Sequence, residues 1–180
     1  MGYDDFKKEL KQNRIIVIDG YIGGGLAHQV VLDLLQYAAD DDREQIQLFI
    51  SAYDGEYLDV MAIYDTIRSL KNPVICVCCG AASGFATMLV SACEKGSRYA
   101  LRHTEIRLSQ PSGYMGAGAN QQTEVAILAK ETRIEREVME KVLARCTGKP
   151  IEVIHQDCER DLRLSAEEAV AYGIIDAIYE

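Results

Sequence analysis

The residues best suited to nucleophilic chemistry lie in the stretch Cys78–Met88, which reads CCGAASGFATM. This stretch places Ser83 between small residues where an apolar strand pattern gives way to a helical one, a position at which hydrolases often carry a nucleophile. A serine hydroxyl attacks only when a histidine within hydrogen-bond reach takes its proton and a carboxylate orients that histidine. The chain has three histidines, His28, His103 and His155. None of them is placed by the sequence beside Ser83, so a nucleophilic role is not expected for this serine.

The sequence offers little for metal or nucleotide chemistry. The run 76–79, Cys-Val-Cys-Cys, is not followed by a second Cys or His pair at a ligand-like spacing. Its thiols are therefore interpreted as reduced, small apolar side chains on a buried strand. The glycines at 23–25 lack the full G-x-G-x-x-G spacing of a dinucleotide site. We expect neither a metal nor a cofactor.

The size and charge of the chain limit the classes of partner. Its 180 residues, 48% of them apolar, predict a single domain spanning 1–180. The formal net charge of -9 argues against nucleic acid or an anionic membrane as the main partner. No stretch approaches the roughly 18 apolar residues of a membrane span, and the N-terminus does not read as a signal peptide. A cytoplasmic location is expected, or an organelle stroma if the host bears plastids.

Hydrophobic periodicity predicts strands that alternate with helices. Such alternation implies a mainly parallel sheet with crossover helices, an α/β fold. The longest helical pattern covers about 122–146 and ends at Gly148 and Pro150, and Ser165 with Glu168 fits a capping box. A glycine-rich turn is expected at 20–25 and a loop at 52–56. The expected strands are 14–19, 45–51, 74–79, 98–101 and 105–108, and the other expected helices are 26–38, 57–71, about 80–92, about 151–158 and one that begins at Ser165.

Several stretches together carry a resemblance that runs almost unbroken from about residue 3 to about residue 179. They are 62–67 (AIYDTI), 95–101 (KGSRYAL), Gln110-Pro111, 145–150 (RCTGKP) and 159–176. They resemble the proteolytic subunits of Clp proteases, the ClpP-like serine peptidases of family S14. The resemblance implies a crotonase-like ββα superhelix with a long handle helix at about 122–146. It also implies heptameric rings stacked as a tetradecamer, with a chamber that degrades polypeptides supplied by an AAA+ unfoldase.

In the register of this resemblance, two members of the family's Ser-His-Asp triad are replaced. Gly84 stands at the nucleophile position, and Ser83 falls one residue before it. Ser109 stands at the histidine position, directly before Gln110-Pro111. Asp161 matches the acid of the triad and is retained. The resemblance therefore implies a site without its nucleophile and base.

The oxyanion region implied by the resemblance comprises Asp54, Gly55 and Phe85. The family's glycine-rich loop lends a backbone N–H to the developing oxyanion, whereas the corresponding residues 52–56 read Ala-Tyr-Asp-Gly-Glu. The carboxylates of Asp54 and Glu56 are expected to repel negative charge at this place.

Unfoldase docking in the family uses apolar clefts between neighbouring subunits. By position, Phe49, Tyr99 and Leu101 match residues that line such clefts, although Gln47 stands where the family often has an aromatic residue. Ordinary packing within the fold is the alternative role for these side chains.

We therefore expect a Clp proteolytic-subunit homologue that is catalytically silent, similar to the ClpR-type paralogues that share rings with active ClpP subunits. Its rings are homo- or hetero-oligomers with ClpP-type subunits. Two alternatives stay open, a serine endopeptidase that uses Ser83 or Ser109 and a crotonase-like acyl-CoA enzyme or binding module. The family also carries a segment that forms axial loops ahead of residues 3–14, and this chain begins almost at that point.

Overall fold

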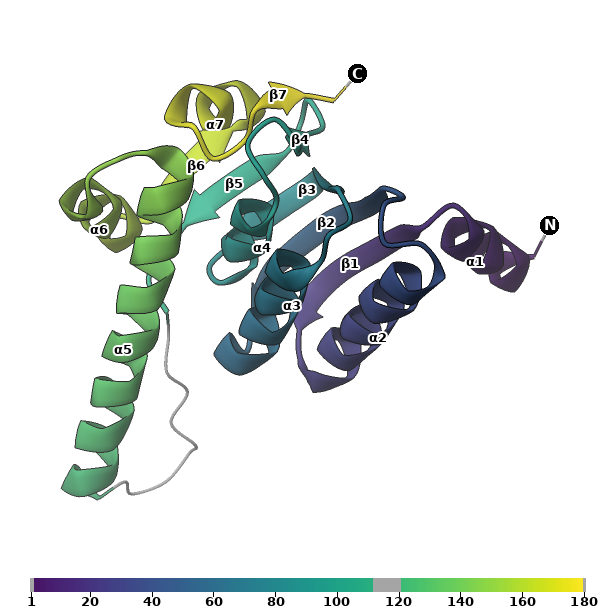
Figure 1. Cartoon of the computed structure of the whole chain (residues 1–180). Helices are drawn as coiled ribbons and strands as arrows, with labels where there is room; N and C mark the ends of the chain where they lie inside the picture. Colours follow the sequence, from purple (N-terminus) through teal and green to yellow (C-terminus); the bar gives the residue numbers. More distant parts are fainter. Residues whose placement is uncertain (1, 112–120, 180) are drawn as a thin grey trace.

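A computed structural model of the chain describes residues 2–111 and 121–179. The elements alternate along the chain as the periodicity predicts (Figure 1). The helices are α1 (Tyr3–Gln12), α2 (Gly24–Asp40), α3 (Tyr57–Ser69), α4 (Ala86–Ala92), α5 (Gln122–Thr147), α6 (Ile151–Glu159) and α7 (Ala166–Tyr172). The strands are β1 (Ile15–Ile22), β2 (Ile46–Gly55), β3 (Val74–Ser83), β4 (Arg98–Ala100), β5 (Glu105–Leu108), β6 (Leu162–Ser165) and β7 (Ala177–Ile178).

The strands form one sheet with the order β1-β2-β3-β4-β7, all of whose neighbours are parallel. Strand β5 pairs parallel with the second half of β3, and β6 adds to β5 in the antiparallel sense. The predicted α/β class, with a mainly parallel sheet and crossover helices, is confirmed.

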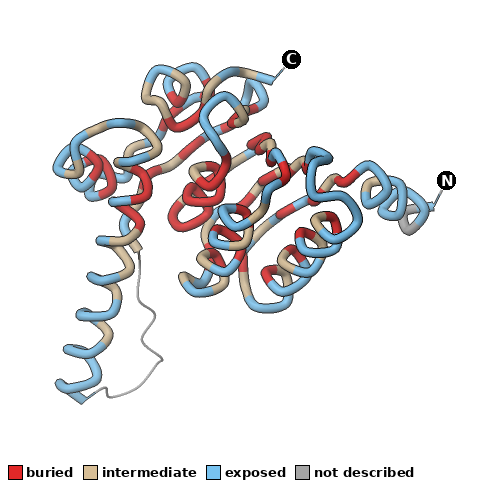
Figure 2. The backbone as a smooth tube through the Cα atoms, viewed as in Figure 1, coloured by how far each residue is buried: buried red, intermediate tan, exposed pale blue. Residues whose placement is uncertain are grey.

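One face of the sheet is covered by helices α2, α3 and α4 (Figure 1). Alternate residues of β2, namely Ile46, Leu48 and Ile50, point to this face and are completely buried. Leu34 of α2 and Ile63 of α3 meet them from the helix side of the hydrophobic cluster. Figure 2 shows this buried layer running between the sheet and its helices. Burial of these apolar side chains holds the ends of the central strands in place.

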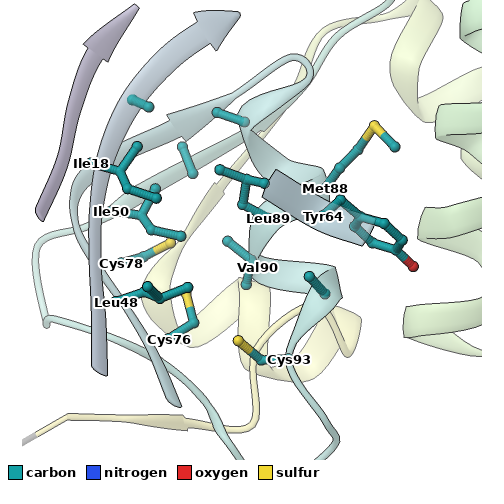
Figure 3. Close-up of a cluster of buried hydrophobic side chains, with 14 of the residues drawn as sticks. Ile18, Leu48, Ile50, Tyr64, Cys76, Cys78, Met88, Leu89, Val90 and Cys93 are labelled. Atoms are coloured by element: carbon teal, nitrogen blue, oxygen red, sulfur yellow. The ribbon is translucent and has the colours of Figure 1, made fainter. Parts of the chain in front are cut away.

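The cysteines of β3 are part of this core. Cys76 and Cys78 are buried and lie beside Leu48 and Ile50, with Cys93 close by (Figure 3). The thiols are free. Side-chain hydrogen bonding with Cys78 and Cys93 raises the pKa of the Cys76 thiol, and burial raises it further. These cysteines therefore act as small apolar side chains, as the sequence predicts.

The predicted turn at 20–25 and the predicted loop at 52–56 are wrong. Strand β1 continues through Gly20, whose φ of +81° accompanies a shift in the register, and ends at Ile22. Strand β2 continues to Gly55, because its last residues pair with β1 as Tyr21↔Asp54 and Ile22↔Gly55. This pairing is non-local, so the polar composition of the segment did not indicate it.

The helix expected from Gly80 to about Ala92 is present as α4 and ends at Ala92, but its expected start is wrong, because β3 runs on to Ser83 and α4 begins at Ala86. Gly80 has a φ of +85°, and the chain beyond it pairs with β5. The short strands β6 and β7 were not predicted. They are stabilised by pairing with β5 and β4, which lie far away in the sequence.

Helix α5 projects from the body of the fold (Figure 1). Its buried residues, Met139, Glu140, Val142 and Leu143, all lie near its C-terminal end. Val125, Ile127 and Ile134 on the projecting part are 43%, 52% and 48% exposed. The expected long handle helix is therefore present, and its projecting part is largely exposed in the structure described (Figure 2).

The helix ends follow the predicted local signals. Helix α5 ends before Gly148, which has a φ of +73°, a conformation that glycine adopts without steric cost. At the start of α7, Ser165 Oγ accepts the N–H of Glu168, and the Glu168 carboxylate accepts the N–H of Ser165. In the ranges that the structure describes, no helix is long and apolar enough to cross a membrane.

Candidate active site

The sheet topology brings the three triad positions to one edge. Ser83 is the last β3 residue paired with β5, so Gly84 follows directly at the carboxyl end of β3. The β5–β6 ladder ends at the pair Leu108↔Leu162, and Ser109 and Asp161 are the next residue on each strand beyond it. The ends of β3 and β5 and the start of β6 thus gather positions 84, 109 and 161, which are distant in sequence.

Gly84 presents no side chain here and has no room for one. Its φ is +55°, a left-handed conformation that disfavours L-residues with a Cβ. A Cβ built on Gly84 would lie 2.4 Å from Oδ1 of Asp54 and 2.8 Å from its Cγ. A serine therefore cannot take this position unless the Asp54 side chain moves.

The side chain of Asp54 occupies a pair of converging backbone donors. Its Oδ1 accepts the N–H of Gly55 at 2.9 Å and the N–H of Phe85 at 3.1 Å. Two backbone N–H groups that point at one oxygen are the arrangement that stabilises the oxyanion in acyl transfer. The sequence predicted that Asp54 and Glu56 would lie near the oxyanion position and repel negative charge. In the structure, Asp54 goes further, because its carboxylate itself accepts both of the hydrogen bonds that an oxyanion would use.

The surroundings of these donors are acidic. Burial raises the pKa of Asp54, against the lowering effect of its two backbone hydrogen bonds, and Glu56 raises it further. Burial and the hydrogen bond from Tyr21 to Glu56, 2.8 Å long, raise the pKa of Tyr21 to about 12. Burial raises the pKa of Glu135 on α5, and the charges of Glu131 and Glu56 add to the shift. A transition state that gains negative charge would be disfavoured in this field.

Ser83 is engaged as a hydrogen-bond donor. Its hydroxyl donates to the backbone carbonyl oxygen of Tyr53. An amide carbonyl is not a base that can take the proton, so this contact does not activate the serine. In the described part of the chain no histidine hydrogen-bonds to Ser83 or Ser109. His155, on α6, bonds instead to Glu140 and Arg136.

Asp161, the residue aligned with the triad acid, has a different partner. Its Oδ2 forms a salt bridge of 2.9 Å with Nη2 of Arg107, and both side chains are partly exposed. The sequence analysis did not identify Arg107 as a residue of this site. The strand pattern could have indicated it, because residues i and i+2 of a strand share a face and Arg107 stands two residues before Ser109. Tyr53, whose carbonyl binds Ser83, had no such signal.

The proposed docking residues lie on the sheet face opposite the helices. Phe49 and Tyr99 are in one row of the sheet, linked through Val77 by the register of β2, β3 and β4. Val17 of β1 extends the row and is 49% exposed. Leu101, directly after β4, is 38% exposed. The structure thus places the predicted side chains on one apolar surface.

The chain was compared with models of known protein families. The model of the Clp protease family matches residues 2–180. The match covers the sheet edge at which residues 84, 109 and 161 gather and the projecting helix α5.

Proposed function

The chain belongs to the Clp protease family, and within this family we propose that it is a catalytically silent subunit with a structural or regulatory role in ATP-dependent proteolysis. The observation that carries the proposal is the Asp54 carboxylate, which accepts both N–H groups, of Gly55 and Phe85, that an oxyanion would need. A peptide carbonyl would have to displace this carboxylate before its oxygen could be stabilised.

Peptide hydrolysis by a Ser-His-Asp triad lacks its nucleophile and its base in this chain, and the retained acid has no histidine to orient. Position 84 has no hydroxyl to attack the carbonyl carbon. Ser109 cannot accept a proton as an imidazole does, because a neutral hydroxyl is a very weak base. Asp161 has no imidazole to orient and pairs with Arg107. Since triad members act as a unit, the remaining acid supplies little rate enhancement.

Two exposed features support a role in assembly. Ile127 and Ile134 leave the projecting part of α5 apolar and uncovered, which suits packing between stacked rings. The apolar surface of Phe49, Tyr99 and Leu101 suits an AAA+ unfoldase or a neighbouring subunit. In this role the chain resembles the ClpR-type paralogues. It lowers the number of cutting centres in a heptameric ring or a tetradecamer that it shares with active ClpP-type subunits.

The two alternative functions gain no support from the site. The hydroxyl of Ser83 is committed to the carbonyl of Tyr53. An acyl-CoA thioester would need the same two backbone donors that Asp54 already occupies. Neither a serine peptidase nor a crotonase-type acyl-CoA module therefore has the groups it requires.

The test is labelling of the purified protein with a fluorophosphonate probe, followed by peptide mapping, beside an active Clp peptidase. We expect no labelled serine under conditions that label the active enzyme to completion. Stoichiometric labelling at Ser83 or Ser109 would refute a silent site. Native mass spectrometry of the protein alone and mixed with active subunits gives the ring composition, and failure to form rings in either sample would refute the assembly role.

A further inference from the structure

A pocket outside the candidate active site gathers positive charge. It has a volume of about 460 Å³ and lies between α3, the segment after α4 and the C-terminal end of α5. Four basic residues line it, Arg68, Lys95, Arg98 and Arg145, and Glu94 is the acidic residue among its described lining. The formal net charge of the whole chain is -9, whereas the residues that line this pocket carry a net positive charge.

Arg98 forms the rigid back of the pocket. It is 3% exposed, and its guanidinium binds both carboxylate oxygens of Asp176, with Nη2–Oδ1 at 2.5 Å and Nε–Oδ2 at 2.9 Å. Burial alone would raise the pKa of Asp176, but the hydrogen bonds from Arg98 and from the N–H of Gly96 hold it below its ordinary value. The charges of Arg98 and Asp176 therefore cancel, and the pair fixes the wall without supplying a net charge.

The other three cations are exposed and have no acidic partner. In the ranges the structure describes, Arg68, Lys95 and Arg145 form no ion pair. They come from α3, from the turn before β4 and from the last turns of α5, so the tertiary fold alone brings them to one pocket. Glu94 in the described lining offsets one of these charges, and the positive charge that remains favours an external anion.

Two of these side chains are partly held in place. Arg68 donates from Nη1 to the carbonyl of Ala92 at 3.4 Å. Arg145 donates from Nη2 to the hydroxyl of Tyr64, which points away from the hydrophobic cluster (Figure 3). Because Tyr64 accepts this bond, its own hydroxyl proton remains available, and each guanidinium keeps further N–H donors.

We infer that this pocket binds the oligophosphate group of a small molecule, either a free oligophosphate or a nucleotide. Guanidinium forks match phosphate oxygens in pairs, which makes such contacts stronger than those of a single ammonium group. Three cations without an ion-pair partner outnumber the one carboxylate of Glu94 in the lining, and this excess suits a group with several negative charges. The volume is within the roughly 300–1,000 Å³ of small-molecule sites. This site is independent of the proposed loss of catalysis.

The test is isothermal titration of the full chain with sodium tripolyphosphate and, separately, with ATP, in metal-free buffer. We expect saturable binding that weakens with added salt. The variant Arg68→Gln/Arg145→Gln should weaken it at least about tenfold, since it removes two charge-assisted contacts. The matched control is Arg43→Gln/Arg133→Gln, which removes two exposed arginines elsewhere and should leave binding unchanged. Circular dichroism establishes that both variants are folded.

Comparison of the two titrants identifies the source of the phosphate. Equal affinities would support a site for the phosphate chain alone, and tighter binding of ATP would support a nucleotide. Absence of binding, or equal weakening by the control variant, would overturn the inference. A third result would also overturn it: the parent protein does not bind tripolyphosphate, and Arg68→Gln/Arg145→Gln fails to assemble into rings. The pocket would then be a contact between subunits.

Discussion

The proximity of Gly84 and Asp54 predicts that changes at these two positions are strongly non-additive. The perturbations are Gly84→Ser, Asp54→Ala and the two combined. In the structure a Cβ on Gly84 would lie 2.4 Å from Asp54 Oδ1, well inside van der Waals contact. Gly84→Ser alone must therefore expel the Asp54 carboxylate, whereas Asp54→Ala removes it beforehand.

The magnitudes follow from two contributions. A residue with a Cβ at a φ of +55° costs about 1–2 kcal/mol. The loss of two N–H···O⁻ bonds, each worth about 1.5–3 kcal/mol, is partly offset when the carboxylate returns to water, which leaves about 2 kcal/mol. We expect Gly84→Ser to cost about 3–4 kcal/mol and Asp54→Ala about 2 kcal/mol. The double variant should cost no more than Gly84→Ser, a coupling of about 2 kcal/mol.

The assay is urea unfolding of the four proteins at one protein concentration, because assembly contributes to the measured stability. A matched control pairs Gly84→Ser with Asp65→Ala, which removes an exposed carboxylate of α3, and these two costs should add. If the costs of Gly84→Ser and Asp54→Ala also add to within about 0.5 kcal/mol, Asp54 does not fill the space beside residue 84.

The same reasoning applies to reactivity. In a Gly84→Ser/Ser109→His background, the new side chain moves the Asp54 carboxylate off its two backbone donors, but the negative charge of Asp54 stays close to them and repels an oxyanion. Adding Asp54→Ala removes this charge and should therefore increase fluorophosphonate labelling of the new serine about tenfold or more. Equal labelling with and without Asp54 would refute the idea that its carboxylate opposes negative charge at this site.

Three further predictions concern stability and titration. Tyr21 should ionise near pH 12, above its ordinary pKa of 10.0, so the stabilisation from its bond to Glu56 is complete below pH 10 and is lost as the pH rises through 12. Absorbance titration of Tyr21→Phe should lack the phenol that ionises near pH 12, and an unchanged curve would contradict the prediction. Asp176→Asn should lower the free energy of unfolding by about 3 kcal/mol, because it leaves Arg98 buried without its partner. Since the pKa of Asp176 is lowered in the folded protein, the stabilisation from this pair is present above the ordinary pKa of an aspartate and is lost as the pH falls through the lowered pKa of Asp176. Urea unfolding at several acidic pH values checks this. Equal acid sensitivity of Asp176→Asn and the parent protein would contradict the role given to the Arg98–Asp176 pair. Gly55→Ala should destabilise the chain by about 1–3 kcal/mol in the same assay, since its Cβ would lie 2.7 Å from two neighbouring side chains, and an unchanged midpoint would show that the neighbours can yield.

The sequence by itself determined the features that depend on neighbours along the chain. The 3.6-residue period predicted α5, and Gly148 marked its end because glycine adopts a positive φ at low cost. The spacing from Ser165 to Glu168 predicted the cap of α7. Once the chain is aligned with the Clp family, its residues show directly that position 84 has no serine and position 109 has no histidine.

Only the tertiary structure decided which side chain occupies the site that lacks its nucleophile and base. Strand β2 was expected to end before Asp54, but pairing with β1 carries it on to Gly55, and this brings the carboxylate of Asp54 to the N–H of Phe85. The bond between Arg107 and Asp161 and the meeting of three cations at one pocket likewise join segments distant in sequence. Local patterns specify periodicity and helix ends, because those depend on nearby residues. Contacts between distant segments depend on which strands and helices pack together, and hydrophobic burial over the whole fold sets that.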